Sequence, residues 1–379
     1  MPKPIYLDYA AATPLDPVVL KAMQPYFSKI YANPSSIHDA GKKAKEAVDQ
    51  ARITIAKLIG LQPKEIIFTS GGTESVNLAL QGIARQKGKG HIITSQIEHE
   101  AVLETCQYLE QHGFTVTYLP VDQEGIISVP ALEKSIRKDT ILISIIYANN
   151  EIGTIQPISA IRKIAQTSNI PFHTDACQAA GALDLNMQHL GVDLLSLNAS
   201  KMYGPKGIGL LSVRSGIQLT PLIFGGGQEF NLRSGTENVP AIVGFAKALE
   251  LAVKQQKKEN ERLISLQNYF IQEIQKRISN TTLNGHPTER LPNNVNILFK
   301  GVDNETLLHY LNQQEIYASS GSACTAQEMQ PSHVLKAIGM SEKDALSSIR
   351  FTLGKYTTEK ELQYVLQVLA EIVSSLRKL

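Results

Sequence analysis

The chain has 379 residues, of which 43% are hydrophobic, so it is long enough to bury a large core and to divide into two domains. Its 37 lysine and arginine residues almost balance its 35 aspartate and glutamate residues. A net charge of +2 argues against direct binding of nucleic acid or of an anionic membrane, and leaves small molecules and proteins as the expected partners. The three cysteines include no Cys-x-x-Cys pair, so neither structural disulfides nor a zinc site is expected, and no metal is assigned.

The N-terminal sequence lacks the apolar core of a signal peptide, and no apolar run approaches the ~20 residues of a membrane-spanning helix. We therefore expect a cytoplasmic protein with no membrane span. Residues 1–14 end in Tyr9-Ala-Ala-Ala-Thr-Pro14. Such small and apolar residues predict that this segment packs against the rest of the chain.

Helical periodicity is strong over residues 39–59, and strand and helix patterns alternate from there. The expected strands are residues 65–69, 91–95, 115–119, 141–147, 171–175, 194–197 and 208–213. Short apolar strands separated by helices predict parallel βαβ units, in which helices cover both faces of the sheet.

A long helical stretch over residues 239–279, rich in lysine, glutamate and glutamine, is expected to lead to a smaller C-terminal domain. There the patterns predict strands near residues 294–299 and 349–353, and helices at residues 304–312, 331–338 and 358–378. We therefore predict an α/β protein with a mostly parallel central sheet in a large domain of residues 15–255. Residues 1–14 and 256–379 are expected to form a smaller α+β domain.

Polar residues follow several of the predicted strands, at the point where each strand ends. Because ligands bind at the carboxyl ends of parallel strands, these residues are expected to converge on one site. They are Thr73, His99, Asn150, Asp175 and Lys201.

Lys201 lies between a strand that ends at Leu197 and the turn Tyr203-Gly-Pro-Lys-Gly207. A lysine that is desolvated at the mouth of a sheet can lose its proton near neutral pH and form a Schiff base with an aldehyde cofactor, pyridoxal phosphate. The alternative is a solvated surface lysine, which is the usual state of this residue type. The polar residues expected around Lys201 favour the cofactor site.

Pyridoxal phosphate withdraws electrons best when its ring nitrogen stays protonated, which requires a carboxylate beside it. Asp175 is the candidate, with capping of the next helix as the alternative, and Gln178 follows within reach of the ring hydroxyl. His99 can cover the ring face or simply begin a helix. The phosphate is expected near Gly72 and Thr73, where the N–H groups and dipole of a starting helix favour an anion.

Cys324 lies in Ser319-Ser-Gly-Ser-Ala-Cys-Thr325, where small and polar residues offer no periodic apolar face. The pattern predicts an exposed loop, on which a thiolate can act as a nucleophile and then meet a second partner. Cys106 lies on a predicted helix and is expected to be buried packing, whereas Cys177 is expected to line the cofactor pocket without reacting.

Arg350 lies on an otherwise apolar predicted strand, where an unpaired guanidinium would be costly. A bidentate contact with the carboxylate of an amino-acid substrate would compensate this charge. A structural salt bridge is the alternative.

These motifs together resemble the cysteine desulfurases of the NifS and IscS type, which share the pyridoxal-phosphate fold of the class V aminotransferases. The resemblance covers nearly the whole chain and implies the fold type I of pyridoxal-phosphate-dependent transferases. The matching motifs are Tyr6-Leu-Asp-Tyr-Ala-Ala11, Asn33-Pro-Ser-Ser36, Thr69-Ser-Gly-Gly-Thr-Glu-Ser75, Glu98-His99, Asn149-Asn-Glu-Ile-Gly153, Thr174-Asp-Ala-Cys-Gln178, Tyr203-Gly-Pro-Lys-Gly207, Arg233-Ser-Gly-Thr-Glu-Asn238 and Ser320-Gly-Ser-Ala-Cys-Thr325. The last motif is the most discriminating and points to the subgroup with a long cysteine loop.

The resemblance implies that Lys201 forms the Schiff base and moves protons, and that Cys324 becomes a persulfide. It also implies that Asp175 pairs with the pyridine nitrogen and that His99 stacks on the ring and shuttles protons. The other implied contacts are Gln178 and Asn150 with the ring hydroxyl or substrate, Thr73 with the phosphate, Arg350 and Asn33 with the substrate carboxylate, and Thr236 with the phosphate of the neighbouring subunit. The last contact implies a homodimer.

One stretch departs from the family pattern, which has Ser-x-His directly before the lysine with both side chains on the phosphate. This chain has Asn198 and Ser200 in those places. An amide and a hydroxyl can still donate to phosphate, but the imidazole donor is lost. We expect weaker retention of the cofactor, with the chemistry intact.

The expected activity is conversion of L-cysteine to L-alanine, with the sulfur passed to an acceptor such as an iron-sulfur scaffold or a tRNA-thiolation protein. One alternative is another enzyme with the same cofactor, a selenocysteine lyase or a β-eliminating lyase. Another is a non-catalytic binding or assembly subunit, which the altered Asn198 and Ser200 suggest. The presence of Lys201, Asp175 and Cys324 argues against that second alternative.

Overall fold

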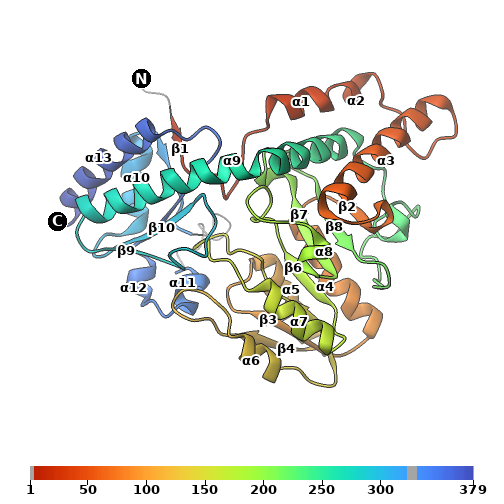
Figure 1. Cartoon of the computed structure of the whole chain (residues 1–379), viewed down its shortest axis with the longest axis horizontal. Helices are drawn as coiled ribbons and strands as arrows, with labels where there is room; N and C mark the ends of the chain where they lie inside the picture. Colours follow the sequence, from red (N-terminus) through yellow and green to blue (C-terminus); the bar gives the residue numbers. More distant parts are fainter. Residues whose placement is uncertain (1–3, 322–330, 379) are drawn as a thin grey trace.

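The computed structural model describes residues 4–321 and 331–378, and its strands form one large sheet and two small ones (Figure 1). The large sheet has seven strands in the order β2-β8-β7-β6-β5-β3-β4. They are β2 (Ile66–Thr69), β3 (His91–Ser95), β4 (Thr115–Leu119), β5 (Thr140–Ser144), β6 (Phe172–Asp175), β7 (Leu194–Asn198) and β8 (Gly209–Val213). Neighbouring strands are parallel except at β8, which is antiparallel to both β2 and β7.

β8 runs in the opposite direction because its connection from β7 is short. Residues 199–208 contain only the single turn η2 (Ala199–Lys201) and a further turn, instead of the helix that a parallel crossover needs. The predicted βαβ pattern therefore does not extend to this pair, and the sheet is mostly rather than fully parallel. The short return places Lys201 directly at the carboxyl end of β7.

Helices cover both faces of the large sheet. Successive strand residues point to opposite faces, so Ile66 and Phe68 pack with α3 and α9 while Ile67 packs with α4 and α5. The helices in this part of the chain are α1 (Pro17–Met23), α2 (Pro25–Ser28), α3 (Asp39–Ile59), α4 (Gly72–Lys87), α5 (Glu100–Gln111), α6 (Val129–Lys134), α7 (Ile158–Thr167) and α8 (Met187–Leu190), with the short η1 (Pro63–Glu65) and η3 (Glu229–Asn231).

The C-terminal part has its own small sheets and its own apolar core. β10 (Asn294–Phe299) pairs with β9 (Thr281–Leu283) and β12 (Ser348–Thr352), and β1 (Ile5–Tyr6) pairs with β11 (Ile316–Tyr317). Leu7 is fully buried in this core, so the N-terminal segment packs against the rest of the chain as its composition indicated. The accompanying helices are α10 (Asn304–Gln313), α11 (His333–Ala337), α12 (Glu342–Ala345) and α13 (Glu359–Leu376).

The long helix α9 (Val239–Arg277) runs along both parts of the molecule (Figure 1). Its buried side chains up to Leu249 belong to the core of the large sheet, and those from Leu263 onward belong to the C-terminal core. Because the core changes along α9, we propose that the chain divides into a large domain of residues 15–255 and a small domain of residues 1–14 and 256–379.

The observed elements follow the sequence patterns closely where the patterns are long. α3, β3, β4 and β10 have the predicted bounds. β5 ends three residues early at Ser144, although Ile145 and Tyr147 still donate backbone hydrogen bonds to the carbonyls of β6. The strands that the sequence did not reveal, β1, β9 and β11, are two or three residues long, too short to produce a pattern.

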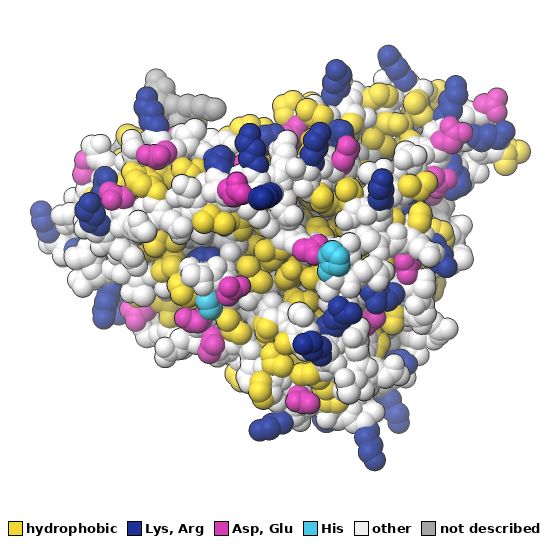
Figure 2. Space-filling model, in the orientation of Figure 1, with side chains coloured by type: hydrophobic (Ala, Val, Ile, Leu, Met, Phe, Trp, Pro, Cys, Tyr) yellow, Lys and Arg dark blue, Asp and Glu magenta, His cyan; other side chains and the backbone are white. Residues whose placement is uncertain are grey.

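No helix among the described residues is both long and apolar enough to cross a membrane. On the face shown in Figure 2, basic and acidic side chains lie interspersed. Large single-sign fields attract nucleic acid, so this mixed surface agrees with the small net charge of +2.

Candidate active site

Residues from five segments meet at the carboxyl edge of the large sheet. The topology explains why, because β2, β3, β5, β6 and β7 all point the same way and their following residues therefore share one edge. The residues at or shortly after the ends of these strands are Thr73, His99, Asn150, Asp175 and Lys201.

The Lys201 amine is held by the N-terminal loop. Its Nζ donates to the carbonyl oxygens of Ala10 and Ala11, at 2.7 and 2.8 Å. The side-chain amide of Gln178 donates to the same Ala10 carbonyl at 3.0 Å. Sequence reasoning missed these two carbonyls, and the clue available was the run of small residues after Tyr9, which lets the backbone approach closely.

Asp175 ends β6 and is only 5% exposed. One oxygen of its carboxylate accepts a hydrogen bond from the backbone N–H of Cys177 at 2.9 Å, so the turn after the strand fixes the side chain. Burial raises the pKa of the Cys177 thiol well above its usual range, and the nearby Asp175 charge raises it further. A thiol that keeps its proton is a poor nucleophile, in agreement with the predicted passive role of Cys177.

The N-terminus of α4 lies against this turn. A Cβ at Gly72 would stand 2.7 Å from the Cys177 sulfur, so only glycine fits there. The amide nitrogen of Asn198 would be 3.7 Å from the same Cβ, which places Asn198 beside the first turn of α4. Thr73, the next residue, is exposed at this helix start. The arrangement supplies backbone and amide N–H donors around one small region, as an anion requires.

Ser200 orients Asn198. Its hydroxyl donates to the Asn198 carboxamide oxygen at 3.0 Å, and its backbone N–H donates to the same oxygen at 3.2 Å. Both bonds occupy the oxygen of the amide, so the NH2 group faces the other way, towards α4. Ser200 is 9% exposed, and its own carbonyl accepts from the hydroxyl of Thr13.

His99 caps the N-terminus of α5, where its Nδ1 accepts from the backbone N–H of Ala101 at 3.0 Å. The simple reading as a helix-start residue is therefore correct for the backbone geometry. The other ring nitrogen, Nε2, takes no part in this bond and lies 3.6 Å from a carboxylate oxygen of Glu100. A role on the cofactor ring stays a prediction.

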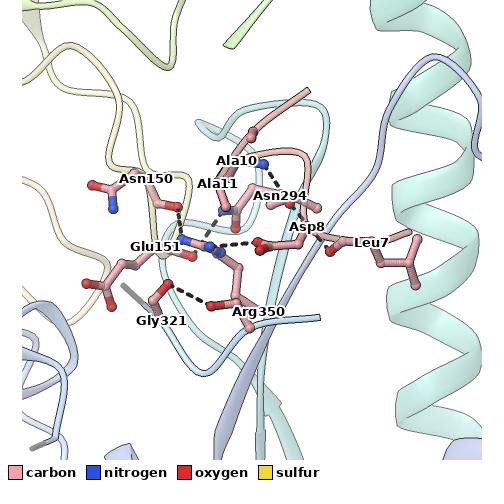
Figure 3. Close-up of polar contacts among 12 residues, drawn as sticks. Leu7, Asp8, Ala10, Ala11, Asn150, Glu151, Asn294, Gly321 and Arg350 are labelled. Carbon is pink, nitrogen blue, oxygen red and sulfur yellow. Dashed lines mark hydrogen bonds and ion pairs between the residues drawn. The ribbon is translucent and has the colours of Figure 1, made fainter. Parts of the chain in front are cut away.

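Arg350 is buried in β12 and pairs with Asp8, from the N-terminal segment, at 2.8 Å (Figure 3). It also donates to the backbone carbonyl of Asn150 at 3.1 Å, while the Asn150 side chain points away from the guanidinium (Figure 3). Its Nε–H is buried without a hydrogen-bond partner in the described part of the chain. The structural salt bridge is thus present, but it leaves donors of the guanidinium unused.

Asn33 and Thr236 are both exposed, and the structure groups them with each other. They line a surface pocket of about 300 Å³ together with Tyr31 and Glu237. The Asn33 carboxamide oxygen accepts from the backbone N–H of Ser35. Neither residue has a hydrogen bond with Arg350 or Lys201 among the described contacts, so their predicted roles on substrate and phosphate stay predictions.

Cys106 lies among the described residues, whereas Cys324 does not. Cys106 is fully buried, as predicted, and burial raises the pKa of its thiol. Cys324 lies outside the described residues, so its predicted role as persulfide carrier rests on the sequence.

Three comparisons place these observations among known proteins. Residues 5–365 match the family Aminotransferase class-V. The chain is 53% identical over 380 aligned residues to "Cysteine desulfurase IscS" of Dictyoglomus turgidum, covering all of this chain and 96% of that protein.

Two solved structures are also similar. A structure titled "NIFS-LIKE PROTEIN" has a TM-score of 0.93 and 39% identity, and the match covers 98% of this chain and all of that one. A structure titled "SspA in complex with cysteine" has a TM-score of 0.82 and 42% identity, with 93% of this chain and all of that one covered.

Proposed function

The chain belongs to the class V aminotransferase family, and from this premise we propose that it is a pyridoxal-phosphate-dependent cysteine desulfurase. It converts L-cysteine to L-alanine and takes up the sulfur on Cys324 as a persulfide. The observation that carries the proposal is the meeting of Lys201, Asp175 and the N-terminus of α4 at one edge of the sheet, in a chain 53% identical over its whole length to a cysteine desulfurase.

The residues at this edge fit pyridoxal phosphate. An amine is present for the aldehyde, a carboxylate for the ring nitrogen, and a helix N-terminus with the Asn198 amide for the phosphate. A Cβ at Gly71 would meet no atom within 4 Å, so the helix start faces open space. When bound, the cofactor withdraws electrons from the α-carbon of an amino acid and weakens the bonds to that carbon.

Lys201 is proposed to bind the cofactor and to move the α-proton of the substrate. Its contacts with the carbonyls of Ala10 and Ala11 hold the amine in place beside the Gln178 amide, which donates to the same Ala10 carbonyl. His99 is proposed as a second proton carrier, through the Nε2 atom that does not cap α5.

Arg350 is proposed to bind the substrate carboxylate, with Asn33 in support. The unused donors of its guanidinium, buried beside Asn150, support this role. A carboxylate that meets the guanidinium side-on would use two N–H groups at once.

Sulfur transfer is assigned to Cys324. Its thiolate attacks the substrate sulfur, the carbon–sulfur bond breaks, and the bonding electrons remain with the substrate carbon, which takes a proton to give alanine. Cys324 then carries the substrate sulfur as a persulfide. Transfer of this outer sulfur to an acceptor thiol restores the Cys324 thiolate.

Product analysis tests this function. Purified protein is given L-cysteine and a dithiol reductant, and alanine, sulfide, pyruvate and ammonia are measured. Equal amounts of alanine and sulfide are expected, whereas pyruvate with ammonia would identify a β-eliminating lyase. Cys324→Ala should lose turnover and keep the cofactor absorbance, while Cys106→Ala, a buried cysteine away from the site, should stay active. Bound cofactor without any alanine from the unmodified protein would contradict the proposal.

A homodimer is part of the same proposal. Asn33 and Thr236 share a surface pocket, and large apolar side chains nearby are exposed, Tyr31 at 77% and Ile37 at 91%. A second subunit placed over this surface would bury them and would bring Thr236 to the phosphate of its neighbour. Sedimentation should give a dimer, and Thr236→Ala should weaken cofactor binding without changing the sedimentation coefficient.

We further propose that the acceptor is a protein, such as an iron-sulfur scaffold or a tRNA-thiolation protein, in the cytoplasm. Thiolate chemistry needs a reducing compartment, and Cys106 and Cys177 are free thiols. Transfer of radioactive sulfur from the loaded enzyme to each purified candidate identifies the acceptor, with Cys324→Ala as the control that should transfer none.

A further inference from the structure

Three side chains outside the proposed chemistry meet where the C-terminal part touches the large sheet. Glu100 begins α5, Glu151 lies in the turn after β5, and His333 begins α11. One potential ligand atom from each lies within 4.8 Å of the other two. Two carboxylates and an imidazole form a donor set that suits zinc and similar divalent transition-metal ions.

The burial of Glu151 is a second observation, independent of the closeness of the three side chains. It is fully buried, and its Oε1 has no hydrogen-bond partner among the described residues. Burial raises the pKa of this carboxyl, and the Glu100 charge raises it further, while His333 and Arg350 act in the opposite direction. In Figure 3 the Glu151 carboxylate points away from the Arg350 guanidinium, so that cation is not its direct partner.

The backbone of Glu151 is held rigidly, so the side chain has a fixed origin. Asn149 accepts the N–H of Glu151 through its side-chain oxygen, and the amides of Asn294 and Asn296 donate to the Glu151 carbonyl. The hydroxyl of Ser332 donates to Oε2 of Glu151. Oε2 is therefore oriented by a neighbour, and Oε1 is left for a further partner.

His333 is in the correct tautomer for a ligand. Its Nε2 lies 3.0 Å from the backbone carbonyl of Glu98, which can only accept, so Nε2 carries the hydrogen. In the neutral ring Nδ1 then has the free electron pair that binds a metal, and a hydrogen bond from the other nitrogen to a carbonyl is the usual support of a metal-bound histidine.

Apolar side chains border the three residues on one side, whereas Glu100 and His333 are themselves only partly buried. The apolar residues are Ile97, Ile152, Val334, Leu335, Ile338 and Ala345, where α11 meets the loops after β3 and β5. Apolar neighbours of this kind strengthen the electrostatic attraction between a cation and its ligands.

We propose that Glu100, Glu151 and His333 bind one divalent transition-metal ion, with zinc as the best match. Ligand bonds of about 2.0–2.2 Å require only small side-chain movements from the present separations of up to 4.8 Å. The ion would join the start of α11, the first helix that the structure describes after Cys324, to the carboxyl edge of the large sheet. The site uses none of the residues assigned to the proposed desulfurase chemistry, although the Glu100 carboxylate lies 3.6 Å from Nε2 of His99.

Calorimetric titration with zinc chloride, after treatment with a chelator and dialysis, tests the site. The full-length holoenzyme with Cys324→Ala is used, because a cysteine thiolate can also bind zinc and would confuse the count of ions. One ion per chain is expected, and His333→Gln should weaken binding about 100-fold or more, since even residues that only support ligands contribute 10–100-fold. Ser332→Ala removes the hydrogen bond to Oε2 of Glu151, a supporting contact, and should weaken zinc binding about tenfold.

Matched controls are Glu104→Gln, at an exposed position on the same helix as Glu100, and His112→Gln, at the exposed residue directly after that helix. Both should bind zinc as tightly as the parent. The proposal is overturned if no zinc binds to the parent, or if His333→Gln and His112→Gln bind it equally. The titration uses neither the substrate L-cysteine nor turnover, so either outcome leaves the desulfurase proposal unchanged.

Discussion

Two buried arginines form ion pairs in the described part of the chain, and they differ in how completely their donors are used. Arg52 of α3 contacts both oxygens of Glu229, at 2.6 and 2.8 Å, and also donates to the carbonyl of Ile66. The same glutamate accepts the backbone N–H of Phe68, so its lone pairs are well used. Arg350 makes one contact with Asp8 and leaves its buried Nε–H without a partner in the described chain.

The difference separates a structural pair from one with capacity for a ligand. Arg52 also lies 4.7 and 5.1 Å from the ring centres of Phe68 and Phe230, so its cation is enclosed by its own fold. Glu229, Phe230 and Asn231 all have positive φ angles, a costly conformation that the Arg52 contact helps to maintain. A guanidinium with unused donors, by contrast, can bind an incoming carboxylate without losing its first partner.

The largest effect is expected from Arg52→Met, which removes one half of the complete pair. Glu229 would be left as a buried charge, so the free energy of unfolding should fall by about 3–5 kcal/mol. Denaturant unfolding measures this change. Adding Glu229→Gln removes the unpaired charge and should recover much of the lost stability. If the free energy of unfolding of Arg52→Met alone stays within about 1 kcal/mol of the parent, the pair is not structural.

Substitution in the Arg350–Asp8 pair should lower activity more than stability. Arg350→Lys keeps a charge near Asp8 but cannot present two parallel N–H groups. Loss of charge-assisted bonds of about 1.5–3 kcal/mol predicts a fall in kcat/KM for cysteine of roughly tenfold to a hundredfold. Alanine formation gives the rates, and denaturation of the same samples should show a smaller loss than Arg52→Met. Unchanged kcat/KM would rule out the substrate role.

A buried histidine that stays neutral gives a third case. His173 is fully buried in β6 between the hydroxyls of Ser144 and Ser196, and burial lowers its pKa to about 4, with Asp175 acting in the opposite direction. Between pH 6.5 and 4 the unfolded chain binds a proton that the folded chain excludes.

The stability that neutral His173 contributes is therefore present above pH 6.5 and is lost as the pH falls towards 4. The slope from this residue is at most about 1.4 kcal/mol per pH unit. His173→Gln should flatten the acid side of a plot of unfolding free energy against pH. His112→Gln, at an exposed position, should not, and equal slopes in the two variants would contradict the assignment.

The sequence revealed the site where local pattern and chemistry agree. Lys201, Asp175 and His99 could be placed because strand ends are visible as apolar runs, and parallel strands bring their ends together. Asp8 could not be assigned to Arg350, because the two are 342 positions apart and nothing local connects them. The partner of a buried arginine is a property of tertiary packing.

The same limit applies to the carbonyls of Ala10 and Ala11 and to Glu151. Backbone acceptors carry no residue-type signal, so the sequence offered only the run of small residues after Tyr9 and did not show the contact with Lys201. Glu151 stood inside a recognised motif, yet its burial and its closeness to His333 depend on how α11 docks. The cysteine count, from which no metal was assigned, cannot report on a site built from carboxylates and imidazole.

The smallest expected effect concerns Ser200, whose hydroxyl donates to Asn198 and not directly to the region in front of α4. Ser200→His should raise the affinity of the apo-protein for pyridoxal phosphate up to about tenfold, since one new hydrogen bond contributes about 0.5–1.5 kcal/mol. Fluorescence titration measures this affinity, with Ser200→Ala as the control for the lost contact to Asn198. Ser200→Ala should lower the affinity because the Asn198 amide loses its orientation. If Ser200→His leaves the affinity unchanged, the departure from the family pattern does not weaken cofactor retention, and the oriented Asn198 amide replaces the imidazole in full.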